Sequence, residues 1–167
     1  VRYYLAPDEE KPLRRCKHKG YIDKIMFLSA VARPRKLANG TWFDGKLGIW
    51  PFGHHEPAKR SSVNRPAGTM EWKNDSVDGD MYRSFMMSHV VPAICELWPD
   101  REFQDLRFKI RIQQDGAPGH IKPARDEEWR QFLEEMGLTG KIELFDQPAN
   151  SPDLNINDLG FFRAIQA

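Results

Sequence analysis

The sequence predicts an α/β fold in which a mixed β-sheet is flanked by helices. Apolar and charged residues alternate over residues 107–112, which is the two-residue period of a half-buried strand. Over residues 126–136 apolar residues recur at spacings of three and four, which is one face of a helix. A further short strand is predicted at residues 141–145, KIELF. Since strands and helices alternate in this way, we expect one domain over residues 1–167.

The composition excludes several classes of protein. A chain of 167 residues with 40% hydrophobic residues is long enough to bury one core, so it is neither disordered nor fibrous. No apolar run approaches the roughly 18 residues of a membrane span, and we expect no membrane partner. Cys16 and Cys95 lack the spacing of metal ligands, which favours two structural thiols in a reducing compartment.

Charge is unevenly distributed along a chain whose net charge is only +1. Residues 11–36 contain nine Lys or Arg against the single acid Asp23, whereas residues 126–146 contain seven acids and two bases. The basic run is either a solvated face or a surface for nucleic acid. Its candidate DNA-binding residues are Arg14, Arg15, Lys17 and Lys19.

The first part of the chain predicts strands. Residues 1–5 are rich in aromatic and β-branched residues and read as a short strand. Residues 25–32 are almost wholly apolar, which predicts a strand buried on both faces at the centre of a sheet. Turn dipeptides at Asn39-Gly40 and Asp44-Gly45 predict a hairpin over residues 39–50.

A long polar connection is expected over residues 51–75, with mobility or ligand contact as its use. His54 and His55 lie in it, but no carboxylate or Cys follows at ligand spacing, so a metal role for them is disfavoured. A helix is predicted after Asp78, with Met81 and Phe85 on its apolar face together with His89 and Val90. Pro92 should kink or divide this helix.

The helix over residues 126–136 has acids in its first turn and Gly137 as its stop. A last helix is predicted from Asp158, with Asn155 or Asn157 as its cap. Its apolar residues Phe161, Phe162 and Ile165 fall at i+3, i+4 and i+7 of Asp158, so this carboxylate should face the sheet. There it would either cap the helix or bind a metal ion.

Asp115 ends the predicted strand and is followed by Gly116, Pro118 and Gly119. An ordinary Asp-Gly turn is one interpretation, and a metal ligand at a strand end is the other. Asp115 and Asp158 together are more informative. Carboxylates at one sheet edge can hold two Mg²⁺ ions about 4 Å apart, which is chemistry for cleaving or transferring phosphodiesters.

Two motifs carry a resemblance to a known family. Residues 113–120, QQDGAPGH, resemble the QDNAPxH motif around the second catalytic carboxylate of Tc1/mariner transposases. Residues 150–155, NSPDLN, with DLGFF at 158–162, resemble the motif around the third. The ending DLGFFRAIQ is especially similar to the plant and oomycete mariner-like members that place Asp in the third position. Similarity also runs through YYLAPDEEKP and KIMFLSAVARPR, so it covers nearly the whole chain.

The resemblance implies an RNase H-like fold, a triad of acidic residues, and Mg²⁺ or Mn²⁺ in a two-metal site. It also implies a nuclear protein, a homodimer, that cuts and joins DNA at terminal inverted repeats and at target DNA. By the same resemblance Asp115 is the second metal ligand and catalytic residue, and Asp158 is the third. Asp153 would support the loop, and His120 would contact DNA or orient the loop, with a direct chemical role less favoured.

Three departures limit this expectation. Gly116 stands where the motif usually has Asn. The family's first catalytic Asp lies in a strand upstream of YYLAPDEE, so we expect a fragment that lacks this strand and is itself inactive. The helix-turn-helix region that reads the repeats is also not in the sequence. A non-catalytic DNA-binding module derived from a transposon is therefore the alternative, and another RNase H-like nuclease is a third, against which the SPDLN and DLGFF pairing argues.

Overall fold

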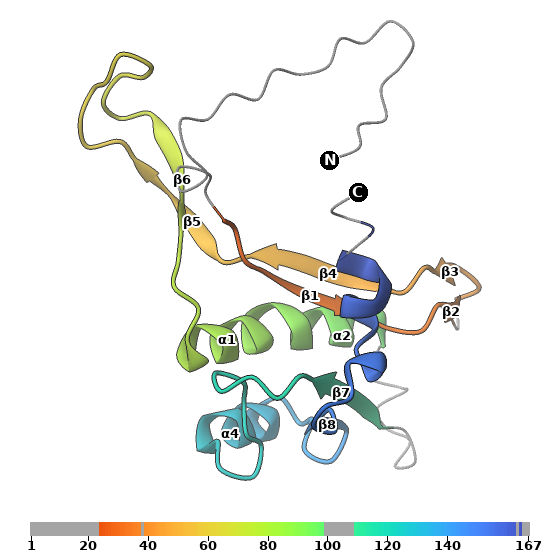
Figure 1. The fold of residues 1–167 in the computed structure, drawn as a ribbon. Helices are drawn as coiled ribbons and strands as arrows, with labels where there is room; N and C mark the ends of the chain where they lie inside the picture. Colours follow the sequence, from red (N-terminus) through yellow and green to blue (C-terminus); the bar gives the residue numbers. More distant parts are fainter. Residues whose placement is uncertain (1–23, 38, 99–108, 163, 165–167) are drawn as a thin grey trace, which may run out of the picture.

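The computed structural model describes residues 24–37, 39–98, 109–162 and 164, and these form a mixed α/β arrangement of small sheets and a few helices (Figure 1). Three of the predictions fall, wholly or in part, outside the described residues. They concern the strand over residues 1–5, the basic residues Arg14, Arg15, Lys17 and Lys19, and the start of the strand over 107–112. Strands pair in four two-stranded sheets, β1 with β4, β2 with β3, β5 with β6 and β7 with β8.

The first sheet is a long antiparallel hairpin. β1 (Phe27–Val31) pairs with β4 (Lys46–Pro51), and the connection between them carries the small pair β2 (Arg35–Lys36) and β3 (Trp42–Phe43). The predicted hairpin over residues 39–50 is confirmed in part, with Asn39-Gly40 forming the β2–β3 turn. The prediction that residues 25–32 form a central strand buried on both faces is wrong. Within the described residues β1 pairs with β4 alone, and Phe27 is 46% exposed.

The prediction that residues 51–75 form a long polar connection is wrong. They contain a second antiparallel hairpin of β5 (Gly53–Pro57) and β6 (Met70–Asn74), with His55 opposite Trp72. The strand residues alternate poorly in polarity, because this hairpin has no buried core beneath most of its length.

A continuous helical column follows. It consists of α1 (Gly79–Phe85), a π-helical segment η2 (Met86–Val90) and α2 (Val91–Leu97). The Asp78 carboxylate caps it by accepting a hydrogen bond from the Met81 N–H at 2.9 Å. The predicted division near Pro92 is present as the π-helical segment, which ends at Val90, two residues before that proline.

The buried face of the column matches the predicted face at Val90 but differs from it earlier in the helix. Tyr82, Met86 and Val90 are buried, whereas Met81 is only partly buried. Phe85 instead packs on Phe52, with ring centroids 4.4 Å apart, at the junction of the two long hairpins.

The second half of the chain is a strand, helix, strand unit. β7 (Ile110–Gln114) pairs in parallel with β8 (Ile142–Asp146), and α4 (Glu127–Glu135) connects them. The predicted helix and strand are both confirmed, including the stop at Gly137, whose φ of +66° favours glycine. The main core joins this unit to the helical column, and its members include Tyr82, Met86, Val91, Ile94, Trp129, Leu133, Ile142 and Leu144.

The C-terminal segment forms a short 3₁₀ turn, η3 (Pro152–Leu154), and a π-helical turn, η4 (Asn157–Phe161). The side chain of Asn155 accepts a hydrogen bond from the Asn157 N–H at 3.2 Å, so Asn155 is the capping residue of the two predicted. The Asn157 amide in turn donates to the Ser29 carbonyl of β1 at 3.3 Å. In the part of the chain that the structure describes, no helix is long and apolar enough to cross a membrane.

Candidate functional site

Two carboxylates follow one another across the carboxyl edge of the parallel pair β7 and β8. Gln114, the last residue of β7, lies opposite Asp146, the last residue of β8, and Asp115 comes directly after Gln114. The Gln147 N–H donates to the Gln114 carbonyl at 2.7 Å, which extends the pairing by one more bond. The strand-end position predicted for Asp115 is therefore confirmed.

Asp115 is held by its own loop. Its Oδ1 accepts a hydrogen bond from the Ala117 N–H at 2.9 Å, which closes the Asp-Gly turn that the sequence allowed. Nδ1 of His120 lies 2.9 Å from the same Oδ1 and 2.9 Å from the Asp115 carbonyl oxygen. The Asp115 side chain remains 46% exposed, so the turn orients the carboxylate without burying it.

The His120 ring is held by stacking on an aromatic ring. It lies on the ring of Tyr82, with centroids 4.2 Å apart and planes inclined by 20°. The Tyr82 hydroxyl donates to Oε1 of Gln114 at 3.1 Å. Burial raises the pKa of Tyr82 well above its usual range, and the negative charges of Asp115 and Asp146 raise it further. Tyr82 therefore stays a neutral hydrogen-bond donor at the edge of the core.

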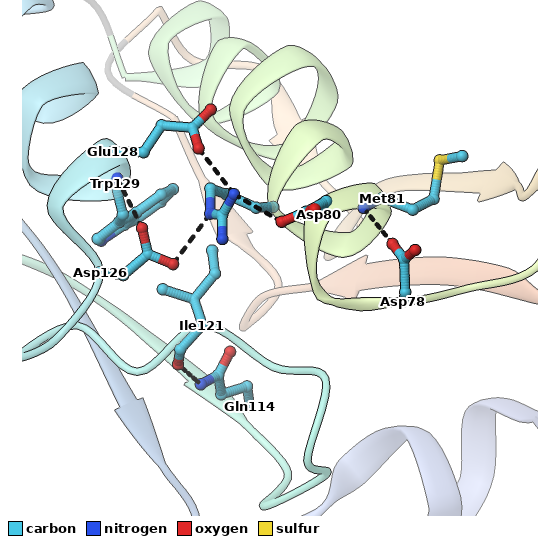
Figure 2. Close-up of polar contacts among 9 residues, drawn as sticks. Asp78, Asp80, Met81, Gln114, Ile121, Asp126, Glu128 and Trp129 are labelled. Carbon is cyan, nitrogen blue, oxygen red and sulfur yellow. Dashed lines mark hydrogen bonds and ion pairs between the residues drawn. The ribbon is translucent and has the colours of Figure 1, made fainter.

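Gln114 joins the core to the second carboxylate. Its Nε2 donates to the Ile121 carbonyl at 2.5 Å, which Figure 2 shows, and to Oδ1 of Asp146 at 2.7 Å. Oδ2 of Asp146 pairs with Nζ of Lys122 at 2.9 Å. The hydrogen bond from Lys122 lowers the pKa of Asp146, and the bond from Gln114 lowers it further.

Asp146 is a site residue that was not predicted from the sequence, because the predicted strand ended at Phe145. The signal was present, because Asp146 ends an apolar strand just as Asp115 does. Two strands of one parallel pair that each end in a carboxylate would have placed both acids at the same edge.

The loop after Asp115 is fastened to the start of α1. A Cβ built on Gly79 would lie 3.3 Å from the carbonyl oxygen of Gly119, so the two backbones approach almost as closely as two glycines allow. Beside this contact is a hollow of about 390 Å³ whose lining includes Arg83, His120, Lys122, Arg125 and Asp126.

An ion-pair cluster, drawn in Figure 2, contributes Arg83, Asp126 and Glu128 to the lining of the hollow. Nε of Arg83 donates to Oδ2 of Asp126 at 2.9 Å. Nη1 of Arg83 donates to Oε2 of Glu128 at 2.7 Å and to Oδ1 of Asp80 at 3.0 Å. Oδ1 of Asp126 also accepts from the Trp129 N–H at 3.0 Å, so this acid caps α4 as well. The cluster fixes α4 to α1 and thereby fixes the walls of the hollow.

The second motif is attached to the first. Nε2 of Gln113 donates to the Leu154 carbonyl at 2.7 Å, which ties the η3 turn to β7. Asp153 lies exposed in that turn. The prediction that Asp158 faces the sheet is wrong, because its side chain is exposed and its Oδ2 accepts a hydrogen bond from the Asn155 amide at 2.8 Å.

The described residues do not by themselves form a metal centre. Among them, no group of three or more His, Cys, Asp or Glu side chains lies close enough together to hold a metal ion. His54 contacts Asp75, with Nδ1 3.0 Å from Oδ1. The acids at the edge of β7 and β8 are engaged instead by His120 and Lys122.

Comparisons with protein-family models, with curated proteins and with solved structures found no match.

Proposed function

We propose that this chain is part of the catalytic domain of a DNA transposase of the Tc1/mariner type, with an RNase H-like fold. In this proposal the complete protein cuts and joins phosphodiester bonds at terminal inverted repeats with Mg²⁺ or Mn²⁺, and it works as a nuclear homodimer. Asp115 and Asp158 supply the second and third carboxylates, and Asp153 and His120 support them.

The observation that carries the proposal is the hydrogen bond from Gln113 to Leu154. It connects the QQDGAPGH strand to the NSPDLN turn across 41 residues, so the two motifs that resemble the family belong to one part of the molecule.

The strand edges are consistent with one further strand. Within the described residues β1 and β7 each pair on one side only, and the C-terminal segment reaches both of them through Leu154 and Asn157. Among the described residues, two buried side-chain atoms near this junction, Oγ of Ser29 and Oδ1 of Asn157, have no hydrogen-bond partner. A further strand beside β1 and β7 would supply polar backbone groups here.

The exposed position of Asp158 has a chemical consequence under this proposal. Its carboxylate is held by one amide, from Asn155, and an exposed hydrogen bond of this kind is worth only about 0.5–1.5 kcal/mol. A divalent cation would be a stronger partner for Asp158 than that amide. The acids described so far do not complete such a site without a further ligand.

The test is cleavage by the longest protein that the reading frame encodes. Its substrate is a duplex that carries the inverted repeats flanking the coding sequence, with Mg²⁺ or Mn²⁺, and nicks are read on a denaturing gel. We expect Asp115→Asn and Asp158→Asn to abolish nicking, while Glu134→Gln, at an exposed position on α4 outside the proposed site, retains it. Nicking that survives in Asp115→Asn would contradict the proposal.

A second candidate is a transposon-derived module that binds DNA without cutting it. It is favoured by the absence of a group of three metal-ligating side chains among the described residues. DNA binding without nicking in either metal, by the unaltered protein, would support the module and contradict the enzyme.

A further inference from the structure

The β5–β6 hairpin stands away from the rest of the described chain (Figure 1). We call residues 53–74 the arm, and residues 58–69, which connect its strands, the arm tip. The base of the arm is anchored, because Phe52 is buried against Phe85 and its N–H donates to the Met26 carbonyl at 2.8 Å. His54 and Asp75 make a further contact there at 3.0 Å.

The arm tip is ordered by hydrogen bonds although it is largely exposed. The Ala58 N–H donates to the Thr69 carbonyl and the Gly68 N–H to the Ala58 carbonyl, both at 2.8 Å. Ser62 bridges to Arg65 through their main chains, and Oγ of Ser61 accepts from the Ala67 N–H at 2.9 Å. A connection this long that keeps one conformation outside the core usually has a use.

The tip carries positive charge and no acid. Its three cations are Lys59, Arg60 and Arg65. Arg65 is paired with Glu71 of β6 at 2.5 Å, whereas Lys59 and Arg60 are exposed and have no ion-pair partner within the described part of the chain. Val63, which lies between Arg60 and Arg65 in the sequence, is fully exposed.

We propose that the arm is a DNA-binding ribbon whose Lys59 and Arg60 contact the phosphates of a duplex. Unpaired cations on an ordered, protruding element are complementary to a polyanion. A two-stranded β-ribbon fits the major groove of B-DNA, which is about 12 Å wide. The choice of DNA among polyanions rests on the proposed function, but binding by the arm requires neither metal nor cleavage.

The arm is also connected to the candidate site. β6 continues through residues 75–78 into α1, and the first residue of α1, Gly79, lies against Gly119 of the Asp115 loop. DNA held on the arm would therefore be held by the element that leads directly to that loop.

The experiment measures fluorescence anisotropy of a labelled duplex of about 20 base pairs, in EDTA, at salt concentrations from about 50 to 200 mM. In the double variant Lys59→Gln with Arg60→Gln, we expect affinity at the lowest salt to fall about tenfold. The plot of log affinity against log salt has a negative slope, and its magnitude should decrease by about 1.8, which is 0.9 for each lost phosphate contact. The control is Lys109→Gln with Arg130→Gln, which removes the same charge from exposed positions outside the arm and should change affinity less than about twofold.

Equal losses in the two double variants would overturn the proposal, because they would report net charge alone. Binding of polyglutamate with the same dependence on Lys59 and Arg60, and with greater affinity than DNA, would also overturn it in favour of an acidic protein partner. The two proposals are tested by separate measurements, the arm by binding in EDTA and the proposed function by loss of nicking in Asp115→Asn with metal present. If the arm variant binds normally and Asp115→Asn loses nicking, the arm proposal fails and the proposed function stands.

Discussion

Gln113 and Leu154 are joined by a hydrogen bond of 2.7 Å between the side-chain amide of one and the main-chain carbonyl of the other. Gln113 is exposed, and it projects from the strand whose next two residues, Gln114 and Asp115, build the site. The bond therefore holds a turn of the C-terminal segment beside the strand without contributing to the core.

Gln113→Ala should loosen this turn and leave the strand intact. The exposed bond is worth about 0.5–1.5 kcal/mol, so the loss of global stability should be small. Hydrogen exchange of residues 152–161 should become faster, while exchange in β7 changes little. Gln131→Ala is the matched control, since it removes an exposed amide that contacts Glu135 on α4. Equal acceleration in both variants would argue against the connection.

Tyr82→Phe should reduce stability by about 1–2 kcal/mol at neutral pH, because it leaves Oε1 of the buried Gln114 without its donor. The raised pKa of Tyr82 adds a pH dependence. Below the unfolded pKa, near 10, both states are neutral; above it the unfolded state ionises first, so the native protein loses stability.

The free energy of unfolding in urea should therefore fall for the unaltered protein as pH rises above about 10. Tyr82→Phe lacks this hydroxyl, so its curve should be flatter and the difference between the two proteins should narrow. A difference that stays constant from neutral to alkaline pH would contradict the assignment.

Asp126→Ala removes two interactions at once. The helix cap to Trp129 is worth about 1 kcal/mol and the charge-assisted bond to Arg83 about 1.5–3 kcal/mol, so a loss of about 2.5–4 kcal/mol is expected. Asp126→Asn keeps a capping oxygen and should lose about half as much. Asp80→Ala removes only an exposed partner of Arg83 and should cost about 0.5 kcal/mol or less. Equal losses in the three variants, measured by urea unfolding, would contradict this division.

Asp146→Asn tests the ion pair with Lys122. The pair is partly exposed and screened by solvent, so the loss at pH 7 should be only about 0.5–1 kcal/mol. Because the folded pKa of Asp146 is lowered, its contribution is present above the unfolded value near 3.9 and is lost as pH falls through the folded value. The gap between the two proteins should therefore close in acid, whereas Asp153→Asn should show no gap at pH 7.

Local signals in the sequence predicted the second half of the fold well. The helix after Asp126 has a cap, a clean apolar face and a glycine stop, and each of these acts within a few residues. Asp115 was predictable for the same reason, because strand period and turn residues meet at that position. These elements are decided locally and then confirmed by packing.

The parts that sequence reasoning missed are decided by partners or by an unusual backbone. β5 and β6 pair with each other while His54, His55 and Glu56 show no apolar alternation. The orientation of Asp158 was derived from α-helical spacing, but Asn157–Phe161 is π-helical. With i to i+5 bonding, residues three and four positions on no longer stack above Asp158.

The π-helical turn at Met86–Val90 contains one residue more than an α-helical turn closed by the same two backbone groups would. The Val91 N–H donates to the Met86 carbonyl, which is one residue farther back than in an α-helix. If one residue were deleted from this turn, the Val91 N–H could bond the same Met86 carbonyl as in an α-helix, so α2 would keep its orientation relative to α1. The π-helical turn thus holds one extra residue while Val91 and Ile94 remain in the core.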